Sequence, residues 1–311
     1  QEILWFGGSG LGDKTLFRGV KKLLPGYCLT WSRGQWEERA YWSAEQVREN
    51  EASLGENTAQ LTEYLEAAVR RQLVSDVPVG AFLSGGIDSS AVVAFASRHY
   101  TGRLKTFSAG FDFVGDANEL PQARAVAKHF GTEHEELVIN GGDVPQLLEA
   151  LVWHHDEPFG DAANIPLYLL CRALKGEPKV ILQGDGGDEM FGGYRRYSLL
   201  RHYRFWRTLS SARTLVGQLG GRRGKRLERI LNAFGSRDDA ERMALLLTLE
   251  TKSNTPNRIL HSDWREKVKS YDPFARYREI ETRFQDKDRV QKMLWTDAHI
   301  LLPDDFLEKV D

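Results

Sequence analysis

Between residues 77 and 183 the sequence alternates short apolar runs with longer amphipathic stretches. The predicted strands are residues 77–83, 104–111, 133–139 and 178–183. The predicted helices between them are 89–100, 120–130, 144–155 and 165–176. Strands that alternate with helices pair in parallel through right-handed crossovers, which places helices on both faces of one sheet. The sequence therefore predicts an α/β fold with a doubly wound parallel sheet.

The segment before this region has a different pattern. Residues 1–42 contain short apolar runs separated by turn signals at Pro25-Gly26 and Arg33-Gly34, which predicts a short β-rich region.

A polar connector is predicted next, at residues 43–57. The helix that follows is expected to begin at Thr58, with Asn57 and Gln60 as a capping box at its start.

Beyond Tyr194 no further strand is predicted. Residues 195–311 have mostly helical patterns and open with a basic, aromatic-rich stretch at 195–229. We therefore expect a short N-terminal part at residues 1–45 and a larger domain at 46–311 that ends in a helical region.

Composition places the chain among ordinary globular proteins. Hydrophobic residues make up 41% and charged residues 28% of its 311 residues. The net charge of −2 gives no overall attraction to nucleic acid or a membrane, and no apolar run approaches the roughly 20 residues that span a bilayer. Cys28 and Cys171 lack CxxC spacing, which favours a reducing, cytoplasmic compartment over a disulfide framework or zinc site. Cys171 lies in an apolar stretch and is predicted to be buried.

The first glycine-rich stretch, FLSGGIDSSAVVAF at residues 82–95, lies between a predicted strand and a predicted helix. Gly85 and Gly86 allow backbone N–H groups to approach an anion, and the following helix N-terminus carries a positive partial charge. Loops that hold a transferred terminal phosphoryl group usually contain a lysine, whereas this stretch has none and has Asp88 instead. A carboxylate beside phosphates implies Mg²⁺. Because the pattern is short, an ordinary strand–turn–helix connection is the alternative.

The second glycine-rich stretch, ILQGDGGDEMFGGY at residues 181–194, has five glycines around Asp185, Asp188 and Glu189. Clustered carboxylates repel one another, so a metal ion or a cationic substrate group is expected beside them. Both stretches follow predicted strands, and ligands of doubly wound sheets bind at the carboxyl ends of strands. The sequence therefore predicts one site built from both stretches.

Together these motifs resemble the synthetase domain of glutamine-dependent asparagine synthetases, within the ATP pyrophosphatase (PP-loop) superfamily. LSGGIDSS at residues 83–90 is similar to the pyrophosphate-binding loop of that superfamily, and GDGGDEMFGGY at 184–194 is similar to a motif of the synthetases. Residues 15–42 resemble the end of the family's N-terminal amidotransferase domain with the link that follows it. LPDDFLEKVD at 302–311 resembles the start of a later family segment. The resemblance implies an adenine nucleotide alpha-hydrolase-like fold.

The resemblance further implies an ATP-dependent carbon–nitrogen ligase. A substrate carboxylate attacks the α-phosphorus of ATP and releases pyrophosphate, and ammonia then displaces AMP from the acyl-adenylate to give an amide. The implied substrates are aspartate or a related acid and ammonia from glutamine, with ATP and Mg²⁺ as cofactors. A homodimer is one expected state, and neither a membrane nor a nucleic-acid partner is expected.

The resemblance assigns site residues on both motifs. Pyrophosphate and Mg²⁺ are assigned to Ser84, Gly85, Gly86, Asp88, Ser89 and Ser90. Adenosine is assigned to Leu83, Ala109, Gln183 and Gly184. The expected catalytic residues are Asp185, Ser84 and Asp88, and Asp188 is the expected second metal carboxylate. In a doubly wound sheet the loops that carry Asp88 and Asp188 can meet above the strand ends, so both carboxylates are expected to hold one Mg²⁺.

The chain also departs from the family pattern. Asp185 occupies a position where these synthetases usually have glutamate, and Gln183 occupies one where they usually have serine. The family's glutaminase uses an N-terminal cysteine, whereas this chain begins with Gln1, so no glutamine hydrolysis is expected from it. The lysine that supports the family's amidation step is expected beyond Asp311.

Three alternatives remain at this stage. Lysidine and thiouridine synthetases share SGGxDS loops and bind tRNA through basic surfaces, which the stretch 195–229 could provide. Relatives of the asparagine synthetases act on other acids, in β-lactams, peptides or surface sugars. A domain that binds ATP or a partner without turnover is the third alternative, which the presence of Asp88 and Asp188 disfavours.

The stretch WHHDEPFGD at residues 153–161 contains adjacent histidines. Neighbouring residues on a helix point about 100° apart, so His154 and His155 cannot readily chelate one ion. Packing at a helix end and a role in shaping the substrate pocket are the favoured interpretations over a metal site.

Overall fold

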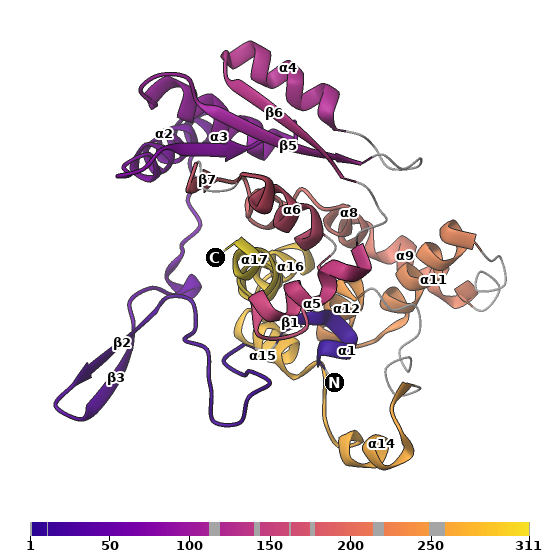
Figure 1. Cartoon of the computed structure of the whole chain (residues 1–311). Coiled ribbons are helices and arrows are strands. Elements are labelled where there is room, and N and C mark those ends of the chain that lie inside the picture. Colours follow the sequence, from indigo (N-terminus) through magenta and orange to yellow (C-terminus); the bar gives the residue numbers. More distant parts are fainter. Residues whose placement is uncertain are drawn as a thin grey trace. The chain divides into compact units, whose positions relative to one another are not determined.

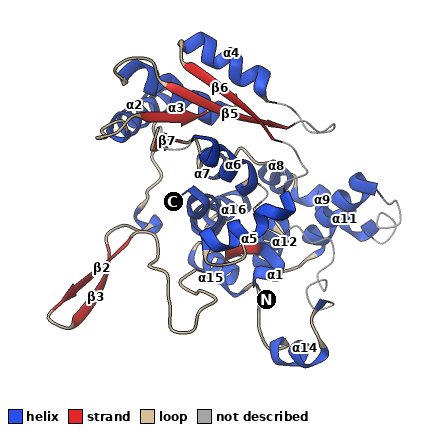
Figure 2. Ribbon diagram, viewed as in Figure 1, coloured by secondary structure: helices blue, strands red, loops and turns tan. Residues whose placement is uncertain are grey.

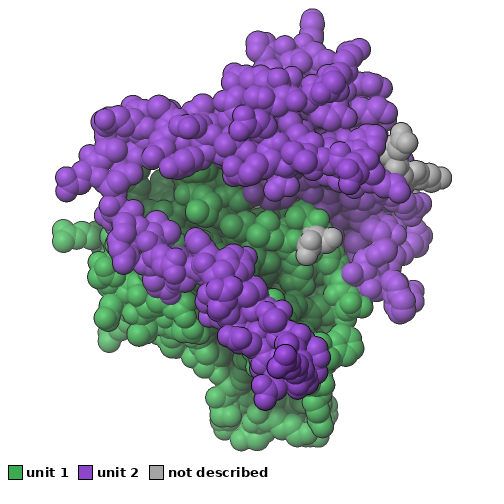
Figure 3. Space-filling view, turned by 90° about the vertical axis from the view of Figure 1, so that its left-hand side faces the viewer, with its two compact units in different colours: residues 1–25, 155–161, 186–311 green, residues 26–154, 162–185 purple. Residues whose placement is uncertain are grey.

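The computed structural model describes residues 2–10, 12–111, 119–139, 144–161, 163–174, 178–213, 221–248 and 259–310. The chain forms two compact units (Figure 3). Unit 1 comprises Gln1–Pro25, His155–Asp161 and Gly186–Asp311, and unit 2 comprises Gly26–His154 and Ala162–Asp185. The chain therefore passes between the units four times. The expected division at residues 45 and 46 concerns sequence modules and stays a prediction.

Unit 2 contains a four-stranded sheet of order β6-β5-β4-β7 (Figures 1 and 2). The strands are β4 (Val79–Phe82), β5 (Lys105–Phe111), β6 (Glu133–Ile139) and β7 (Val180–Leu182). All three pairings are parallel, with Ala81 opposite Thr106 on β5 and Leu182 on β7. The four strands predicted from the apolar runs are thus confirmed.

Helices cover both faces of this sheet. They are α3 (Ile87–His99), α4 (Leu120–Phe130) and α6 (Asn164–Leu174). The predicted helix that precedes α6 is also present, as α5 (Val144–His155). Figure 1 shows α4 on one side of β5 and β6 and α6 on the other. The core between the sheet and helices α2 (Leu54–Gln72), α3 and α4 includes the buried side chains of Val79, Ala81, Val93 and Ala123. The doubly wound parallel sheet is therefore confirmed.

The helix before the sheet begins earlier than predicted. Helix α2 spans Leu54–Gln72, after a short 3₁₀ helix η1 at Ala44–Gln46. Its N-cap is Ser53, whose side chain and backbone form a capping box with Glu56. The predicted start at Thr58 with an Asn57 cap was wrong, and the polar connector is correspondingly shorter.

The N-terminal region is only partly β-structured. Residues Glu2–Phe6 form helix α1, which the β-rich prediction missed, and Gly7–Gly10 form β1. Strands β2 (Tyr27–Ser32) and β3 (Gln35–Ala40) pair as an antiparallel hairpin. Arg33 and Gly34 have φ values of 52° and 82°, which is the geometry of a tight hairpin turn. The predicted turn at Arg33-Gly34 is confirmed.

Unit 1 is mostly helical, as predicted for the region after Tyr194. Its helices from Gly187 onward are α7 (Gly187–Phe191), α8 (Arg195–Arg201), α9 (Tyr203–Leu209), η3 (Ser210–Ala212), α11 (Gly221–Gly235), α12 (Asp239–Leu247), α14 (Ser262–Val268), α15 (Ala275–Arg283), α16 (Arg289–Thr296), η4 (Asp297–Leu307) and α17 (Glu308–Val310). Leu231, Phe234, Met293 and Ile300 are fully buried among them. η4 is a π-helix that contains Pro303.

Two further predictions concern exposure. Among the described residues, no helix combines the length and apolar character needed to cross a membrane. Both cysteines are free thiols, and Cys171 is exposed on α6, so the prediction that it is buried was wrong.

Candidate functional site

The two glycine-rich stretches follow neighbouring parallel strands. β4 pairs directly with β7, so the chain leaves both strands at the same edge of the sheet. Leu83, only 1% exposed, continues the ladder by donating its backbone N–H to the Phe107 carbonyl of β5 at 2.9 Å. Ser108 donates its hydroxyl to the Leu83 carbonyl and ties the start of the first loop to β5. Ala109, assigned to adenosine, lies near the carboxyl end of β5.

Gly85 and Gly86 shape the turn between β4 and α3. Gly85 has a φ of +81°, a left-handed conformation that favours glycine. A Cβ at Gly85 would lie 2.6 Å from both the Gln122 side chain and the Ala123 backbone nitrogen, so the loop packs closely against α4. Gly86 is the N-cap of α3, and the first N–H groups of a helix have no intrahelical acceptor. The loop therefore presents a helix N-terminus suited to an anion.

Serine hydroxyls hold this loop together. Ser84 donates its backbone N–H to Ser89 Oγ at 3.2 Å, the two hydroxyls lie 3.0 Å apart, and Gly86 donates its N–H to Ser84 Oγ at 3.2 Å. Two of the predicted phosphate ligands thus also have a structural role that the sequence did not reveal. Ser90 Oγ is buried and has no hydrogen-bond partner among the described residues, which leaves an unsatisfied hydroxyl beside the loop.

The second loop packs directly on the first. A Cβ at Gly184 would lie 2.7 Å from the Ser89 backbone nitrogen and 2.8 Å from the Asp88 carbonyl carbon. Only glycine allows this approach, which places Gln183 and Gly184 beside the start of α3. The structure therefore brings together the predicted residues Leu83–Ser90, Gln183 and Gly184 within unit 2.

Asp185 and Asp188 belong to different units. Asp185 is exposed and is the last residue of unit 2, whereas Asp188 is half-buried in α7 of unit 1. A Cβ at Gly193 would overlap the Asp188 carboxylate, so the absence of a side chain at Gly193 leaves space for Asp188. The expectation that Asp88 and Asp188 together hold one metal ion stays a prediction.

Glu189 differs from the other carboxylates of the motif. It is 2% exposed and accepts a hydrogen bond from the Tyr194 hydroxyl. The Arg196 guanidinium lies 3.8 Å from the centre of the Tyr194 ring and contacts buried Asp297 through Nε at 3.0 Å and Nη2 at 2.9 Å. Burial raises the pKa of Asp297 to about 6, although the Arg196 charge acts in the opposite direction. The network of Glu189, Tyr194, Arg196 and Asp297 therefore anchors the end of the second motif, and sequence reasoning missed it.

No group of three or more His, Cys, Asp or Glu side chains is arranged to hold a metal ion within the described ranges. Mg²⁺ commonly uses one or two carboxylates and completes its shell with phosphate oxygens and water. Half-buried Asp88, in the first turn of α3 beside the unsatisfied Ser90 hydroxyl, fits that type of site.

The adjacent histidines at the end of α5 face different rings. The His154 ring lies 5.4 Å from that of Tyr168, and the His155 ring stacks on Phe159 at 4.6 Å. These contacts support the interpretation of packing at a helix end.

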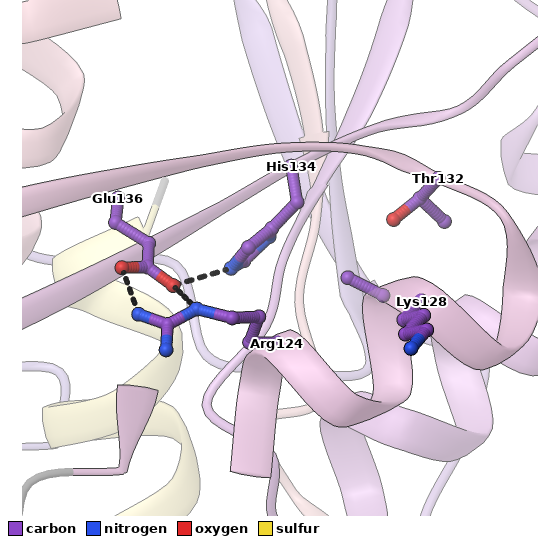
Figure 4. Close-up of a pocket in the computed structure, with 6 residues that line it drawn as sticks. Arg124, Lys128, Thr132, His134 and Glu136 are labelled. Atoms are coloured by element: carbon purple, nitrogen blue, oxygen red, sulfur yellow. Dashed lines mark hydrogen bonds and ion pairs between the residues drawn. The ribbon is translucent and has the colours of Figure 1, made fainter. Parts of the chain in front are cut away.

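A pocket of about 440 Å³ in unit 2 lies between α4 and β6 (Figure 4). Figure 4 shows Arg124 paired with Glu136 through two contacts, of 3.0 and 2.8 Å. His134 points toward the same carboxylate at 3.6 Å, and its burial lowers its pKa. Glu136 already neutralises Arg124, which leaves Lys128 as the one cation of the lining without an ion pair in the described part of the chain.

The geometry defines a doubly wound α/β protein with two glycine-rich loops at neighbouring strand ends. The family model for asparagine synthase matches residues 60–311, and the chain therefore belongs to that family.

Curated relatives agree with this membership. The chain is 43% identical over 138 residues to a putative asparagine synthetase of Mycobacterium bovis, which is 44% of this chain and 21% of that protein. It is 34% identical over 207 residues to asparagine synthetase 3 of Bacillus subtilis, covering 62% of this chain and 34% of that protein. It is also 30% identical over 200 residues to amidase chyE of Penicillium rubens, covering 58% of this chain and 30% of that protein.

The chain spans only 21% to 34% of the length of these relatives. Among solved structures, the NH3-dependent NAD synthetase of Campylobacter jejuni aligns with 74% of this chain and 96% of that chain, at 16% identity and a TM-score of 0.32.

Proposed function

We propose that this chain is the synthetase part of an ATP-dependent amide ligase that forms AMP and pyrophosphate. The observation that carries the proposal is the close packing of Gly184 on Asp88 and Ser89, which joins both glycine-rich loops at one edge of the sheet. Membership of the asparagine synthase family supports the same reaction class.

The proposed reaction has two steps. An oxygen of the substrate carboxylate attacks the α-phosphorus of ATP, the bond to the β-phosphate oxygen breaks, and pyrophosphate leaves. Ammonia then attacks the acyl carbon of the adenylate, AMP leaves, and the nitrogen loses a proton to give the neutral amide. The loop at Ser84–Ser90 would bind the leaving pyrophosphate, which explains why it needs no lysine for a moving terminal phosphoryl group.

The residues of the two loops have distinct proposed roles. The backbone around Gly85 and Gly86 and the unsatisfied Ser90 hydroxyl would donate hydrogen bonds to pyrophosphate oxygens. Leu83, Ala109, Gln183 and Gly184 would surround adenosine. Asp185, exposed at the end of the second loop, would act in adenylate formation, and Ser84 would keep the loop in its binding conformation.

Asp88 and Asp188 would hold Mg²⁺. Bound Mg²⁺ would neutralise the charge of the leaving pyrophosphate. Asp76, an exposed aspartate of unit 2, provides a control carboxylate.

Calorimetric titration of this chain with ATP, in Mg²⁺ and in EDTA, tests the metal assignment. Replacement of Asp88 or Asp188 by asparagine is expected to weaken MgATP affinity by about tenfold, because each change removes one charged ligand. Affinity for metal-free ATP should change much less, and Asp76→Asn should behave as the wild type. Unchanged MgATP affinity in Asp88→Asn would remove this carboxylate from the site.

Aspartate is the proposed acceptor, with ammonia from glutamine as the nitrogen source in the complete protein. The similarity to amidase chyE supports another acid as a second candidate. The shorter Asp185 side chain, where the family usually has glutamate, is a specific reason to test both.

The most informative experiment is a screen of carboxylic acids for acid-dependent exchange of labelled pyrophosphate into ATP, with and without tRNA. Exchange with aspartate is the expected result. Exchange with a different acid would retain the ligase class and reassign the acceptor. Production of ADP and phosphate, or exchange that requires tRNA, would contradict the proposal.

A further inference from the structure

Four arginines line a pocket of about 290 Å³ in unit 1 that the proposed reaction does not use. Arg195 and Arg196 come from the start of α8, and Arg226 and Arg229 come from α11. Leucine and isoleucine side chains of α8, α11 and α12 complete the wall. Among the residues that the structure describes, no aspartate or glutamate lines the pocket. The pocket therefore combines positive charge with an apolar wall.

One of these arginines is already neutralised. Arg196 pairs with buried Asp297 and stacks on Tyr194, as described above, and its side chain is only 14% exposed. Its charge is compensated by the protein itself.

The other three arginines differ from Arg196. Arg195 and Arg226 are exposed, Arg229 is half-buried, and none of the three forms an ion pair with a carboxylate within the described part of the chain. Arg226 and Arg229 are three residues apart on α11 and so lie on one face of that helix. Like charges at this spacing destabilise a helix. Burial, followed by the neighbouring Arg226 charge, lowers the pKa of Arg229. The pocket thus has an unfavourable concentration of charge that a bound anion would relieve.

The number of free charges indicates the class of ligand. A carboxylate would neutralise one guanidinium, whereas a phosphate monoester carries about 1.5 to 2 negative charges at neutral pH. Guanidinium groups also match phosphate oxygens through paired N–H donors. A pocket of about 290 Å³ with an apolar wall suits a small molecule better than the solvated backbone of a nucleic acid.

We propose that this pocket binds a small phosphate monoester, with the phosphate on Arg195, Arg226 and Arg229 and its organic part against the apolar wall. This inference goes beyond the proposed amide ligase activity and uses none of the residues proposed to bind ATP.

Phenyl phosphate is a suitable probe because it has one phosphate, a small apolar group, and neither adenine nor pyrophosphate. We expect isothermal titration of the 311-residue chain to detect phenyl phosphate and no binding of phenol. Arg226→Gln and Arg229→Gln should each weaken affinity by about tenfold, the effect of losing one charge-assisted contact.

Lys225→Gln is the matched control, since Lys225 is exposed on the same helix and does not line the pocket. It should retain wild-type affinity. Arg229 is half-buried, so the exposed Arg226 provides a variant whose folding should be undisturbed, checked by circular dichroism. Equal weakening in Lys225→Gln would show general electrostatic attraction and overturn the proposal. If phenyl phosphate does not bind, the proposal is overturned as well. The same holds if the chain instead binds a single-stranded RNA oligonucleotide in a salt-dependent way.

Discussion

At the scale of single residues, Gly184 makes the most demanding contact of the candidate site. Any side chain there would press on the backbone of Asp88 and Ser89. We expect Gly184→Ala to lower the free energy of unfolding by about 1–3 kcal/mol through overpacking and to weaken ATP binding by at least about tenfold, because the loops must separate. Gly55 is exposed in the first turn of α2 with open space around it, so Gly55→Ala is the matched control and should leave ATP affinity unchanged. Wild-type ATP affinity in Gly184→Ala, measured by calorimetry, would mean that loop packing is unimportant for binding.

Asp305 gives a prediction about pH. Burial, followed by the nearby charge of Asp161, raises its pKa to about 7, although Lys309 opposes the rise. Because the folded-state pKa lies above the unfolded value of about 3.9, the favourable contribution of protonated Asp305 is fully present below that value and is lost as the pH rises through about 7. Asparagine imitates the protonated form at every pH.

We therefore expect Asp305→Asn to be more stable than the wild type at pH 8, by about 2 kcal/mol after allowance for partial exposure. The difference should nearly vanish at pH 4. Urea unfolding at pH 4 and at pH 8 measures this difference in the free energy of unfolding, with Asp76→Asn as the control. A difference that is the same at pH 4 and pH 8 would contradict this assignment.

Local patterns identified most of the candidate site, and only packing revealed the rest. Ser84–Ser90 and Gln183–Gly184 could be selected because their chemistry is contiguous in sequence and each stretch ends a strand. The contact of Arg196 with Asp297 joins residues 101 positions apart, and no local pattern encodes it. Ser84 and Ser89 were predicted as ligands, but their mutual hydrogen bond depends on the loop conformation.

At the scale of elements, the start of α2 shows how two similar signals compete. Ser53 with Glu56 has the Ser-x-x-Glu form of the capping box, whereas the prediction considered only Asn57 with Gln60, four residues later. In the structure Asn57 donates its side-chain amide to the Ala52 carbonyl at 2.9 Å, so it lies within the first turn and supports the earlier cap.

The capping role of Ser53 is directly testable. Its hydroxyl accepts from the Glu56 backbone at 3.3 Å, and loss of such a cap typically lowers the free energy of unfolding by about 1 kcal/mol. Ser53→Ala should show that loss in thermal or urea unfolding. Ser43 caps η1 without a side-chain hydrogen bond, so Ser43→Ala should have little effect. Equal losses in both variants would indicate a cause other than capping.

The π-helix η4 could not be predicted from the sequence. Its apolar residues suggested an ordinary helical region. It also contains Pro303, however, and proline lacks the N–H that a regular helix needs. A wider helical turn accommodates that loss and is rare enough to have no reliable sequence signal. Strand β4, by contrast, was predictable because it is a short and mostly buried apolar run. Strand β6 was predicted from its place in the alternation of strands and helices, although most of its residues are exposed.

At the scale of the whole molecule, each unit contains distant stretches of sequence. The predicted boundary at residues 45 and 46 used only local changes in composition, whereas compactness depends on contacts between segments as far apart as Gly12 and Asp304. Local patterns therefore predict the elements, whereas the grouping of distant segments into compact units follows from contacts of this kind, and the boundary between sequence modules stays a prediction.

Ligand binding should be visible as local protection in the 311-residue chain. Hydrogen exchange with saturating MgATP is expected to slow at β4 and α3, because a ligand bound to the native state opposes local opening there. Helix α15 in unit 1 contains none of the proposed ATP ligands and should change less. Unchanged exchange at the start of α3 would contradict the assignment of this loop to ATP.

The four crossings of the chain between the units have a consequence for how such a protein can be divided and recombined. Neither unit corresponds to one uninterrupted stretch of coding sequence, because unit 1 comes from three segments and unit 2 from two. A gene fusion or truncation at any single codon inside residues 26–185 would leave at least one unit without part of its chain. Exchange of whole units between relatives would need several simultaneous junctions, whereas exchange of exposed surface side chains needs none. Laboratory recombination of these sequences should therefore yield functional chimeras mainly when Gly26–Asp185 is inherited as one block, which keeps unit 2 whole and exchanges only the short segment His155–Asp161 of unit 1.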